Sequence, residues 1–216
     1  MGDMVPDPLT DVAYGLLIHL ISGRLRADGD SLFTRVERGP QFLTEFHETY
    51  TAFRRDYPDL CEALVKRFGG PDAIYTMILD GEGVVPSRTT QMYWVVQDAP
   101  DTRPDAIEDE LAGKWLIFLP PDEVDKAWCR VRDATCEGLL GISAKVSTAK
   151  KNPEARDTWK VIYVYTPDWR DEEDVMRARE HLRALGFTDR IGYKRNIETF
   201  RGEYSEKGKR VTFYSA

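Results

Sequence analysis

The chain has 216 residues, of which 42% are hydrophobic and 31% are charged; this composition excludes a disordered chain and fits one large domain or a domain with a helical extension. The net charge of −7 argues against broad nonspecific nucleic-acid binding, which depends on the neutralisation of phosphates. No cationic stretch opens the chain, and the longest apolar run, residues 12–21, is shorter than the roughly 20 residues that span a bilayer. We therefore expect a cytoplasmic protein without a signal peptide or a membrane span.

Residues 1–85 are predicted to form a helical region that packs on a main domain formed by residues 86–216. Apolar residues at helical spacing and flanking Pro and Gly residues predict helices over residues 8–24, 41–56, 58–68 and 71–79. The second of these carries aromatic residues at spacings of three and four, at positions 42, 46, 50 and 53. Such a stripe indicates packing between helices rather than a ligand site.

The pattern changes after residue 90, where short β-forming segments alternate with two helices. Strands are predicted over residues 91–97, 114–119, 140–148, 159–166, 191–194 and 209–214. One helix runs from Pro121 or Asp122 to about Thr135, and another from about Asp168 to Leu185, before Gly186. Strands joined by short loops favour antiparallel pairing, so we predict an α+β fold in which two helices cover one face of a sheet.

Charge is unevenly distributed along this order of elements. Residues 144–216 contain 16 Lys+Arg and 12 Asp+Glu, whereas residues 1–143 contain 14 and 25. A basic C-terminal third permits a specific phosphorylated ligand. The structural alternative is that the basic part and the acidic part attract one another.

Four cationic residues lie on or beside the predicted strands: Lys114, Lys145, Arg156 and Lys194. Alternation within residues 140–148 places Lys145 on the face opposite Ala144 and Val146. Cations on one sheet face need an anion, and phosphate is the commonest biological one. The sequence thus predicts a phosphate-binding sheet face.

From about Trp94 to Tyr214 the chain resembles the basophilic leukaemia-expressed protein family. The segments that carry this resemblance are residues 113–115, 123–138, 143–147, 161–166, 171–175 and 193–194. The resemblance implies the fold of the cap-binding translation initiation factors, a curved antiparallel sheet backed by helices, with a concave open face.

Two functions follow from resemblance. The cap-binding factors hold a methylated guanine between two tryptophans and its phosphates with Lys and Arg, which implies an RNA or nucleotide ligand here. The tryptophans available for stacking are Trp94, Trp115, Trp159 and Trp169.

The order of cationic strands is also similar to that of the bacterial effector phosphothreonine lyases, which remove phosphate by β-elimination. This similarity implies Lys145 as the base, Lys114 and Arg156 as phosphate ligands, and Lys194 or Arg195 closing the site. The lyases carry an acid histidine two residues after the first lysine, where this chain has Leu116. The remaining candidate acids are Tyr163, Tyr165 and Tyr193.

The sequence therefore predicts recognition of a phosphorylated peptide or small molecule on the open sheet face, with or without elimination of phosphate. The alternatives are a noncatalytic RNA or nucleotide module and a structural domain. No cofactor and no metal site are expected, because the His, Cys and acidic residues show no ligand spacing.

Overall fold

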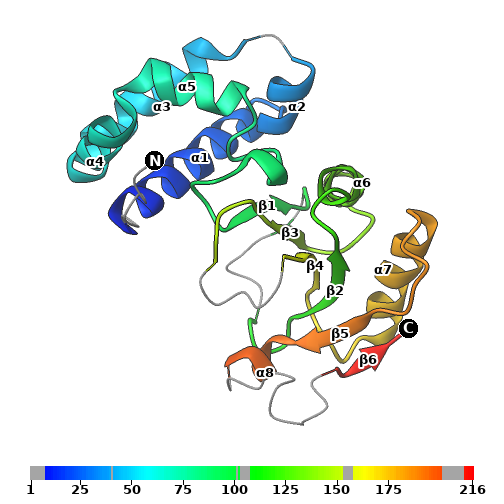
Figure 1. Cartoon of the computed structure of the whole chain (residues 1–216). Helices are drawn as coiled ribbons and strands as arrows, with labels where there is room; N and C mark the ends of the chain where they lie inside the picture. Colours follow the sequence, from blue (N-terminus) through cyan, green and yellow to red (C-terminus); the bar gives the residue numbers. More distant parts are fainter. Residues whose placement is uncertain (1–7, 40, 101, 103–107, 153–157, 201–211) are drawn as a thin grey trace. The chain divides into compact units, whose positions relative to one another are not determined.

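The computed structural model describes residues 8–39, 41–100, 102, 108–152, 158–200 and 212–216. The chain divides into two compact units (Figure 1). One comprises Met1–Tyr93 with Thr148–Pro153, and the other Trp94–Ser147 with Glu154–Ala216. We call them the helical unit and the sheet unit. Within the described residues, no helix is both long enough and apolar enough to cross a membrane.

The helical unit is built from helices α1 to α5 and one short 3-10 turn. Their bounds are Pro8–Ala27 for α1, Leu32–Glu37 for α2, Leu43–Asp56 for α3, Pro58–Phe68 for α4, Pro71–Leu79 for α5 and Pro86–Arg88 for the turn. Proline stands in the first turn of α4 and of α5, where a missing N–H costs no hydrogen bond. Gly69 ends α4 with a φ of 91°, a conformation that glycine adopts without strain. These sequence signals explain why the bounds of α4 and α5 match the prediction.

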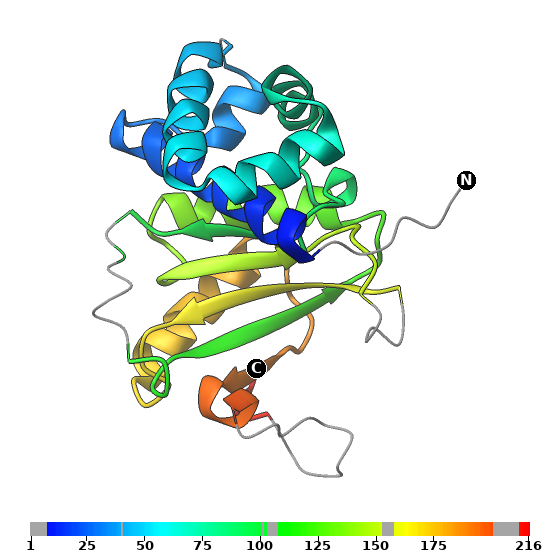
Figure 2. The same ribbon diagram turned by 90° about the vertical axis from the view of Figure 1, so that its left-hand side faces the viewer.

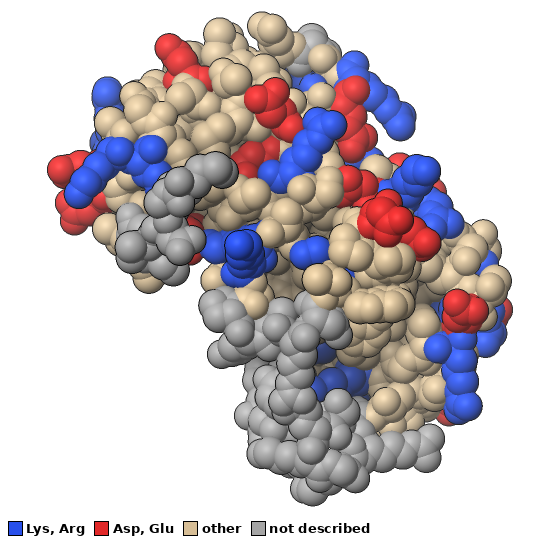
Figure 3. Space-filling model, viewed as in Figure 1, with Lys and Arg blue, Asp and Glu red and all other residues tan. Residues whose placement is uncertain are grey.

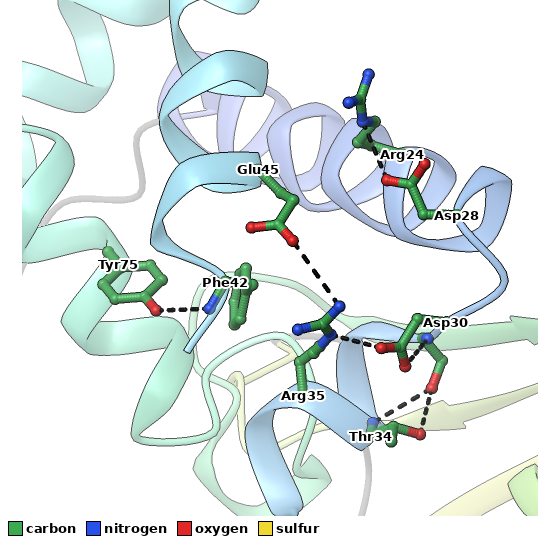
Figure 4. A network of polar contacts seen from close by, with 9 residues as sticks. Arg24, Asp28, Asp30, Thr34, Arg35, Phe42, Glu45 and Tyr75 are labelled. Carbon is green, nitrogen blue, oxygen red and sulfur yellow. Dashed lines mark hydrogen bonds and ion pairs between the residues drawn. The ribbon is translucent and has the colours of Figure 1, made fainter. Parts of the chain in front are cut away.

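The aromatic stripe of α3 lies in the core of the helical unit, which confirms its packing role. Phe42, Phe46, Tyr50 and Phe53 are all buried. Polar contacts surround this core in Figure 4, where the Arg35 guanidinium lies between the carboxylates of Asp30 and Glu45. The Tyr75 hydroxyl accepts a hydrogen bond from the backbone N–H of Phe42 at 3.1 Å, which satisfies a donor at the start of α3.

A short segment that follows the third strand belongs to the helical unit. Its Lys150 ammonium forms an ion pair with the carboxylate of Asp11 in α1 and donates to the carbonyl of Gln91 at 3.0 Å. The same ammonium lies 4.5 Å from the ring centroid of Tyr93. Lys150 is therefore a structural cation, neutralised by the helix next to it.

The sheet unit contains six strands in the order β1-β3-β4-β2-β5-β6, every neighbouring pair antiparallel. Their bounds are Trp94–Asp98, Gly113–Leu119, Ser143–Ser147, Lys160–Thr166, Gly192–Arg195 and Tyr214–Ser215 for β1 to β6. Helices α6 (Val124–Cys136), α7 (Glu172–Ala184) and α8 (Asn196–Phe200) complete the unit. This architecture confirms the predicted α+β fold with a curved antiparallel sheet.

Helices α6 and α7 lie on one face of the sheet, and the other face is turned toward the viewer in Figure 2. Alternate strand residues such as Trp115, Ala144 and Val164 are fully buried against Trp128 of α6 and Val175 of α7. The remaining strand residues form what we call the open face. This one-sided core is why β3 alternates between buried apolar and partly exposed polar positions.

The structure differs from the sequence prediction at the ends of several elements. The third strand begins at Ser143 and not at Leu140, because Gly141 has a φ of 146°, which interrupts the extended chain. Helices α2 and α8 were not predicted. Of the expected last strand, residues 209–211 lie outside the described residues, and β6 covers Tyr214–Ser215.

Candidate functional site

The register of the strands arranges the open face as three rows that cross the sheet. Residues paired across antiparallel strands point to the same face, so each row is a line of neighbouring side chains. The polar row consists of Asp98, Ser143, Tyr165, Lys114 and Lys194. The central row consists of Val96, Lys145, Tyr163 and Leu116. The apolar row consists of Trp94, Ser147, Val161 and Phe118.

Consecutive rows are two residues apart along each strand, which is about 7 Å. The open face therefore changes from cationic and polar to aromatic and apolar over about 13 Å. A surface with this gradient suits a ligand that carries an anionic group at one end and an aromatic or apolar group at the other.

Lys145 stands at the centre of the open face, among three aromatic rings. Its Nζ lies 4.5 Å from the ring centroid of Trp94, 5.4 Å from that of Tyr163 and 5.6 Å from that of Tyr165. Within the described part of the chain, the Lys145 ammonium has no hydrogen bond or ion pair. Burial lowers the pKa of Lys145, because the rings replace water around the ammonium.

Lys114 lies beside Lys145 and shares two of its rings. The Nζ of Lys114 is 5.6 Å from the ring centroid of Tyr163 and 5.4 Å from that of Tyr165. It donates a hydrogen bond of 2.8 Å to Oδ1 of Asn196 in α8. Lys114 is only 7% exposed.

The surroundings of Lys114 disfavour its charge. Burial lowers the pKa of Lys114 to about 8, and the positive charges of Lys145 and Lys194 add to this effect. The negative charge of Glu198 opposes it. A bound anion offsets both the lost hydration and the repulsion, so these lysines form a site whose charge favours an anionic ligand.

The two alternatives for closing the site, Lys194 and Arg195, lie on opposite faces of β5. Lys194 pairs with Lys114 in the register and is part of the polar row. Arg195 instead lies 4.8 Å from the ring centroid of Trp169 and 4.4 Å from that of Phe213. Its guanidinium is paired with the carboxylate of Glu198 at 2.7 Å. We therefore retain Lys194 and exclude Arg195 from the candidate site.

The tryptophans proposed for stacking are distributed over different environments. Trp94 lies in the apolar row and stacks on Tyr163, with ring centroids 5.2 Å apart. Trp115 is fully buried on the helix-covered face, where its Nε1 donates to the carbonyl of Val175, so it cannot stack on a ligand at the open face. Trp159 precedes β4 and is 55% exposed, whereas Trp169 packs against Phe213.

The tyrosines are divided in the same way. Tyr163 and Tyr165 lie on the open face beside the two lysines. Tyr193 is fully buried on the other face, and its hydroxyl hydrogen bonds the Thr166 hydroxyl at 2.7 Å, which excludes it as an acid for Lys145. Burial raises the pKa of Tyr165, so this phenol keeps its proton at neutral pH.

Two further sequence expectations concern residues of the site. Arg156 lies outside the described residues, so its role as a phosphate ligand stays a prediction. Leu116 occupies the central row between Tyr163 and Gly192, where an apolar side chain supplies no proton. Among the described residues, no group of three His, Cys, Asp or Glu side chains is placed to hold a metal ion.

Sequence reasoning missed Asn196 and Glu198, which lie in α8 directly after β5. Asn196 contacts Lys114 from a position 82 residues further along the chain. A single polar residue after a strand carries no local signal for such a contact. Only the pairing of β2 with β5 brings the two residues together.

Solved chains with a similar fold were compared with this one. A chain of Ascaris suum eIF4E-3 in complex with the m2,2,7G cap is 18% identical, with a TM-score of 0.33, over 44% of this chain and 57% of that one. C. elegans eIF4E-3 in complex with the 4E-binding protein Mextli is 14% identical, with a TM-score of 0.39, over 54% and 65% of the two chains. Schistosome eIF4E with m7GpppA and 4E-BP is 17% identical, with a TM-score of 0.39, over 54% and 66%. The chain thus spans less than two thirds of the length of each of these structures.

A comparison with protein families gives a more local result. Residues 106–200 match the family model described as basophilic leukemia-expressed protein Bles03. The match covers the elements from β2 to α8, and with them Lys114, Lys145 and Lys194. The part of the chain from β2 to α8 is therefore similar to the Bles03 family, as the sequence motifs indicated.

Proposed function

We propose that the open face is a noncatalytic binding site for a nucleotide-type ligand. Phosphate groups lie over Lys114 and Lys145, and the base lies toward the apolar row. The observation that carries this proposal is the gradient of the open face, from the partly desolvated Lys114 in the polar row to Trp94 and the exposed Phe118 in the apolar row. A ligand that is only anionic, such as inorganic phosphate, would make no contact with the apolar row.

The phosphate half of the site is supported by the absence, among the described residues, of an ion-pair partner for the Lys145 ammonium. The Glu198 carboxylate accepts from the backbone N–H and Nε of Arg195, at 2.9 and 2.8 Å, and is thereby bound to another cation. A structural role for the basic residues requires ion pairs like that of Lys150 with Asp11. Lys145 has no such partner within the described residues, which favours an external anion.

The base half of the site is supported by exposed apolar side chains. Val96 is 57% exposed and Phe118 is 59% exposed, although both belong to strands of the sheet. Large apolar groups that stay in water on an ordered sheet mark sites of contact with a ligand or partner. Stacking of a base on an aromatic side chain contributes about 1–3 kcal/mol.

The distribution of charge on the face seen in Figure 3 favours a compact ligand over long nucleic acid. Over the described residues visible in Figure 3, Lys and Arg side chains are interspersed with Asp and Glu instead of forming one continuous basic area. Nonspecific binding of nucleic acid needs many phosphate contacts. Three lysines on one sheet face instead suit a nucleotide or the phosphorylated end of an RNA.

A titration followed by tryptophan fluorescence tests this proposal, because all five tryptophans lie between residues 94 and 169. Inorganic phosphate, AMP, ATP and a methylguanosine cap analogue are added in turn to the wild-type chain. We expect saturable binding of a nucleotide, and a loss of affinity of about tenfold or more in Lys145→Ala. Lys126→Ala is the matched control, since Lys126 is exposed on α6, on the other side of the sheet. Equal losses in both variants, or no binding of any nucleotide, would refute the proposal.

Elimination of phosphate from a phosphothreonine peptide is a second candidate, favoured by the lowered pKa of Lys145. In this reaction the neutral lysine amine takes the α-proton. The electron pair of the C–H bond forms the Cα=Cβ double bond, and the bond from Cβ to the phosphate oxygen breaks. Tyr165, whose ring lies beside Lys145, is the proposed proton donor to the leaving phosphate.

Incubation with phosphothreonine peptides and mass measurement separates the two candidates. Loss of phosphoric acid that requires Lys145 would establish the enzymatic function. Intact peptides, together with nucleotide binding by the same preparation, would leave the binding function and remove the enzymatic one.

A further inference from the structure

We infer that Asn196 is a positioning and specificity-determining residue of the open face: its neutral amide oxygen fixes the ammonium of Lys114 without cancelling the charge that an anionic ligand needs. The inference rests on the proposed function, because it assigns a role within the same site. It explains why an amide, and not a carboxylate, stands at this position.

The backbone holds Asn196 in place relative to Lys114. Asn196 is the first residue of α8 and directly follows Arg195, the last residue of β5. Its backbone N–H donates to the carbonyl of Ala112 at 2.9 Å, just before β2 begins. The side chain thus projects from a point that is tied to both strands, and its Oδ1 lies 2.8 Å from Nζ of Lys114.

The chemistry of the pair fixes the orientation of the amide. An ammonium carries donors only, so the oxygen of Asn196 must face Lys114, and the NH₂ group points away. This hydrogen bond restricts a side chain with four rotatable bonds. Restricting the lysine before the ligand arrives reduces the entropy that binding must overcome.

The same short helix shows the contrast between an amide and a carboxylate. Glu198, two residues after Asn196, is bonded to Arg195 through its backbone N–H, Nε and Nη2. The carboxylate is therefore directed to a cation on the helix-covered face, and the amide to a cation on the open face. Exchanging the amide for a carboxylate would convert Lys114 into an internal ion pair and remove it from ligand binding.

The test compares Asn196→Asp, Asn196→Ala and Asn152→Asp. Asn196→Asp changes the charge with almost no change of shape. Asn196→Ala removes the acceptor and adds no charge. Asn152→Asp adds the same charge at an exposed position and is the matched control. Circular dichroism and thermal unfolding establish which variants are folded before binding is measured.

The first readout needs no ligand. The titration of Lys114 is followed by NMR of its side chain. The ionisable groups that surround Lys114 are titrated in the same experiment, and they are Lys145, Tyr163, Tyr165, Lys194 and Glu198. The wild-type pKa is expected near 8. Asn196→Asp is expected to raise the pKa of Lys114 by about one unit or more, while Asn196→Ala and Asn152→Asp do not raise it.

The second readout is the affinity for ATP and for inorganic phosphate. Asn196→Asp is expected to weaken binding by about tenfold or more, and Asn196→Ala by a smaller factor, because only the first cancels the charge of Lys114. Wild-type affinity in Asn196→Asp, or an unchanged pKa of Lys114 in that variant, would overturn the inference. If the wild-type chain binds neither ATP nor inorganic phosphate, the proposed function is refuted. The titration of Lys114 then still decides whether Asn196 positions the ammonium. If Asn196→Asp does not fold, equal affinity of Asn196→Ala and the wild-type chain would overturn the positioning role.

Discussion

Replacing Lys114 with methionine is expected to stabilise the sheet unit and to weaken the binding of an anion. Methionine has a similar length and is apolar, so it fits among the rings of Tyr163 and Tyr165 without bringing a charge into a buried place. The two effects have one origin. The charge that is costly to bury in the free protein is the charge that the ligand needs.

The magnitude follows from the pKa of the lysine. Burial and neighbouring cations lower it from 10.5 to about 8. One pKa unit corresponds to about 1.4 kcal/mol, so the charged form costs about 3 kcal/mol of folding free energy at neutral pH. Methionine loses the hydrogen bond to Asn196 and the contacts with two rings, worth about 2 kcal/mol together. The expected net gain in the free energy of unfolding is about 1 kcal/mol.

This gain has a characteristic pH dependence. Below pH 8 the lysine is charged in both the folded and the unfolded chain, and the wild type bears the full cost. Between pH 8 and the ordinary lysine pKa of about 10.4, the folded chain releases its proton first, so the wild type becomes more stable as the pH rises. The advantage of Lys114→Met is therefore lost across this window. Above this pH window the variant is the less stable protein, because it still lacks the hydrogen bond to Asn196 and the two ring contacts of the lysine.

Denaturant unfolding followed by tryptophan fluorescence measures this difference, since every tryptophan belongs to the sheet unit. Wild type and variant are compared at pH 7 and at several values up to pH 10.5. A variant that is less stable than the wild type at pH 7, by an amount that does not change with pH, would refute the reasoning. That result would mean that the protein already compensates the charge of Lys114.

Three other substitutions test the assignment of faces and the close packing of the sheet. Trp94→Phe is expected to abolish the fluorescence change on nucleotide binding, whereas Trp115→Phe keeps that change and lowers stability through loss of the bond to Val175; the opposite pattern would reverse the two faces. Gly113→Ala is expected to cost about 1–3 kcal/mol in denaturant unfolding, because a Cβ at this position would lie 2.2 Å from the hydroxyl of Tyr193. Wild-type stability of that variant would show that Tyr193 moves aside without cost.

Helices α4 and α5 and the face of Lys145 were predictable because local rules determine them. Pro58, Pro71 and Gly69 mark helix ends through backbone geometry that holds in any fold. Alternation places Lys145 opposite Ala144 and Val146, and the structure has both of these apolar residues in the core.

The same alternation applies to positions where the sequence prediction did not use it. Lys114 and Trp115 are adjacent in one strand, and so are Tyr193 and Lys194, so each pair must face opposite ways. The two members of such a pair cannot both reach a ligand on one face of the sheet. The rule separates the members, and the apolar Trp115 and Tyr193 belong to the core.

Other parts of the site depend on tertiary contacts that leave no local signal. The five residues of α8 are too few for a helical period, so neither the helix nor Asn196 stands out in the sequence. Likewise, the choice between Lys194 and Arg195 depends on where Trp169 and Phe213 pack, and these residues are distant in the chain.

The position of β4 in the strand order has a consequence for the folding of the chain. β4 lies between β3 and β2, so its tyrosines face Lys145 on one side and Lys114 on the other. The two lysines become neighbours only when this strand has docked, which requires contacts between distant parts of the chain and is slow compared with helix formation. A ligand that needs both lysines therefore slows the unfolding of the completed sheet and gives no help to a chain in which only the β3–β4 hairpin has formed.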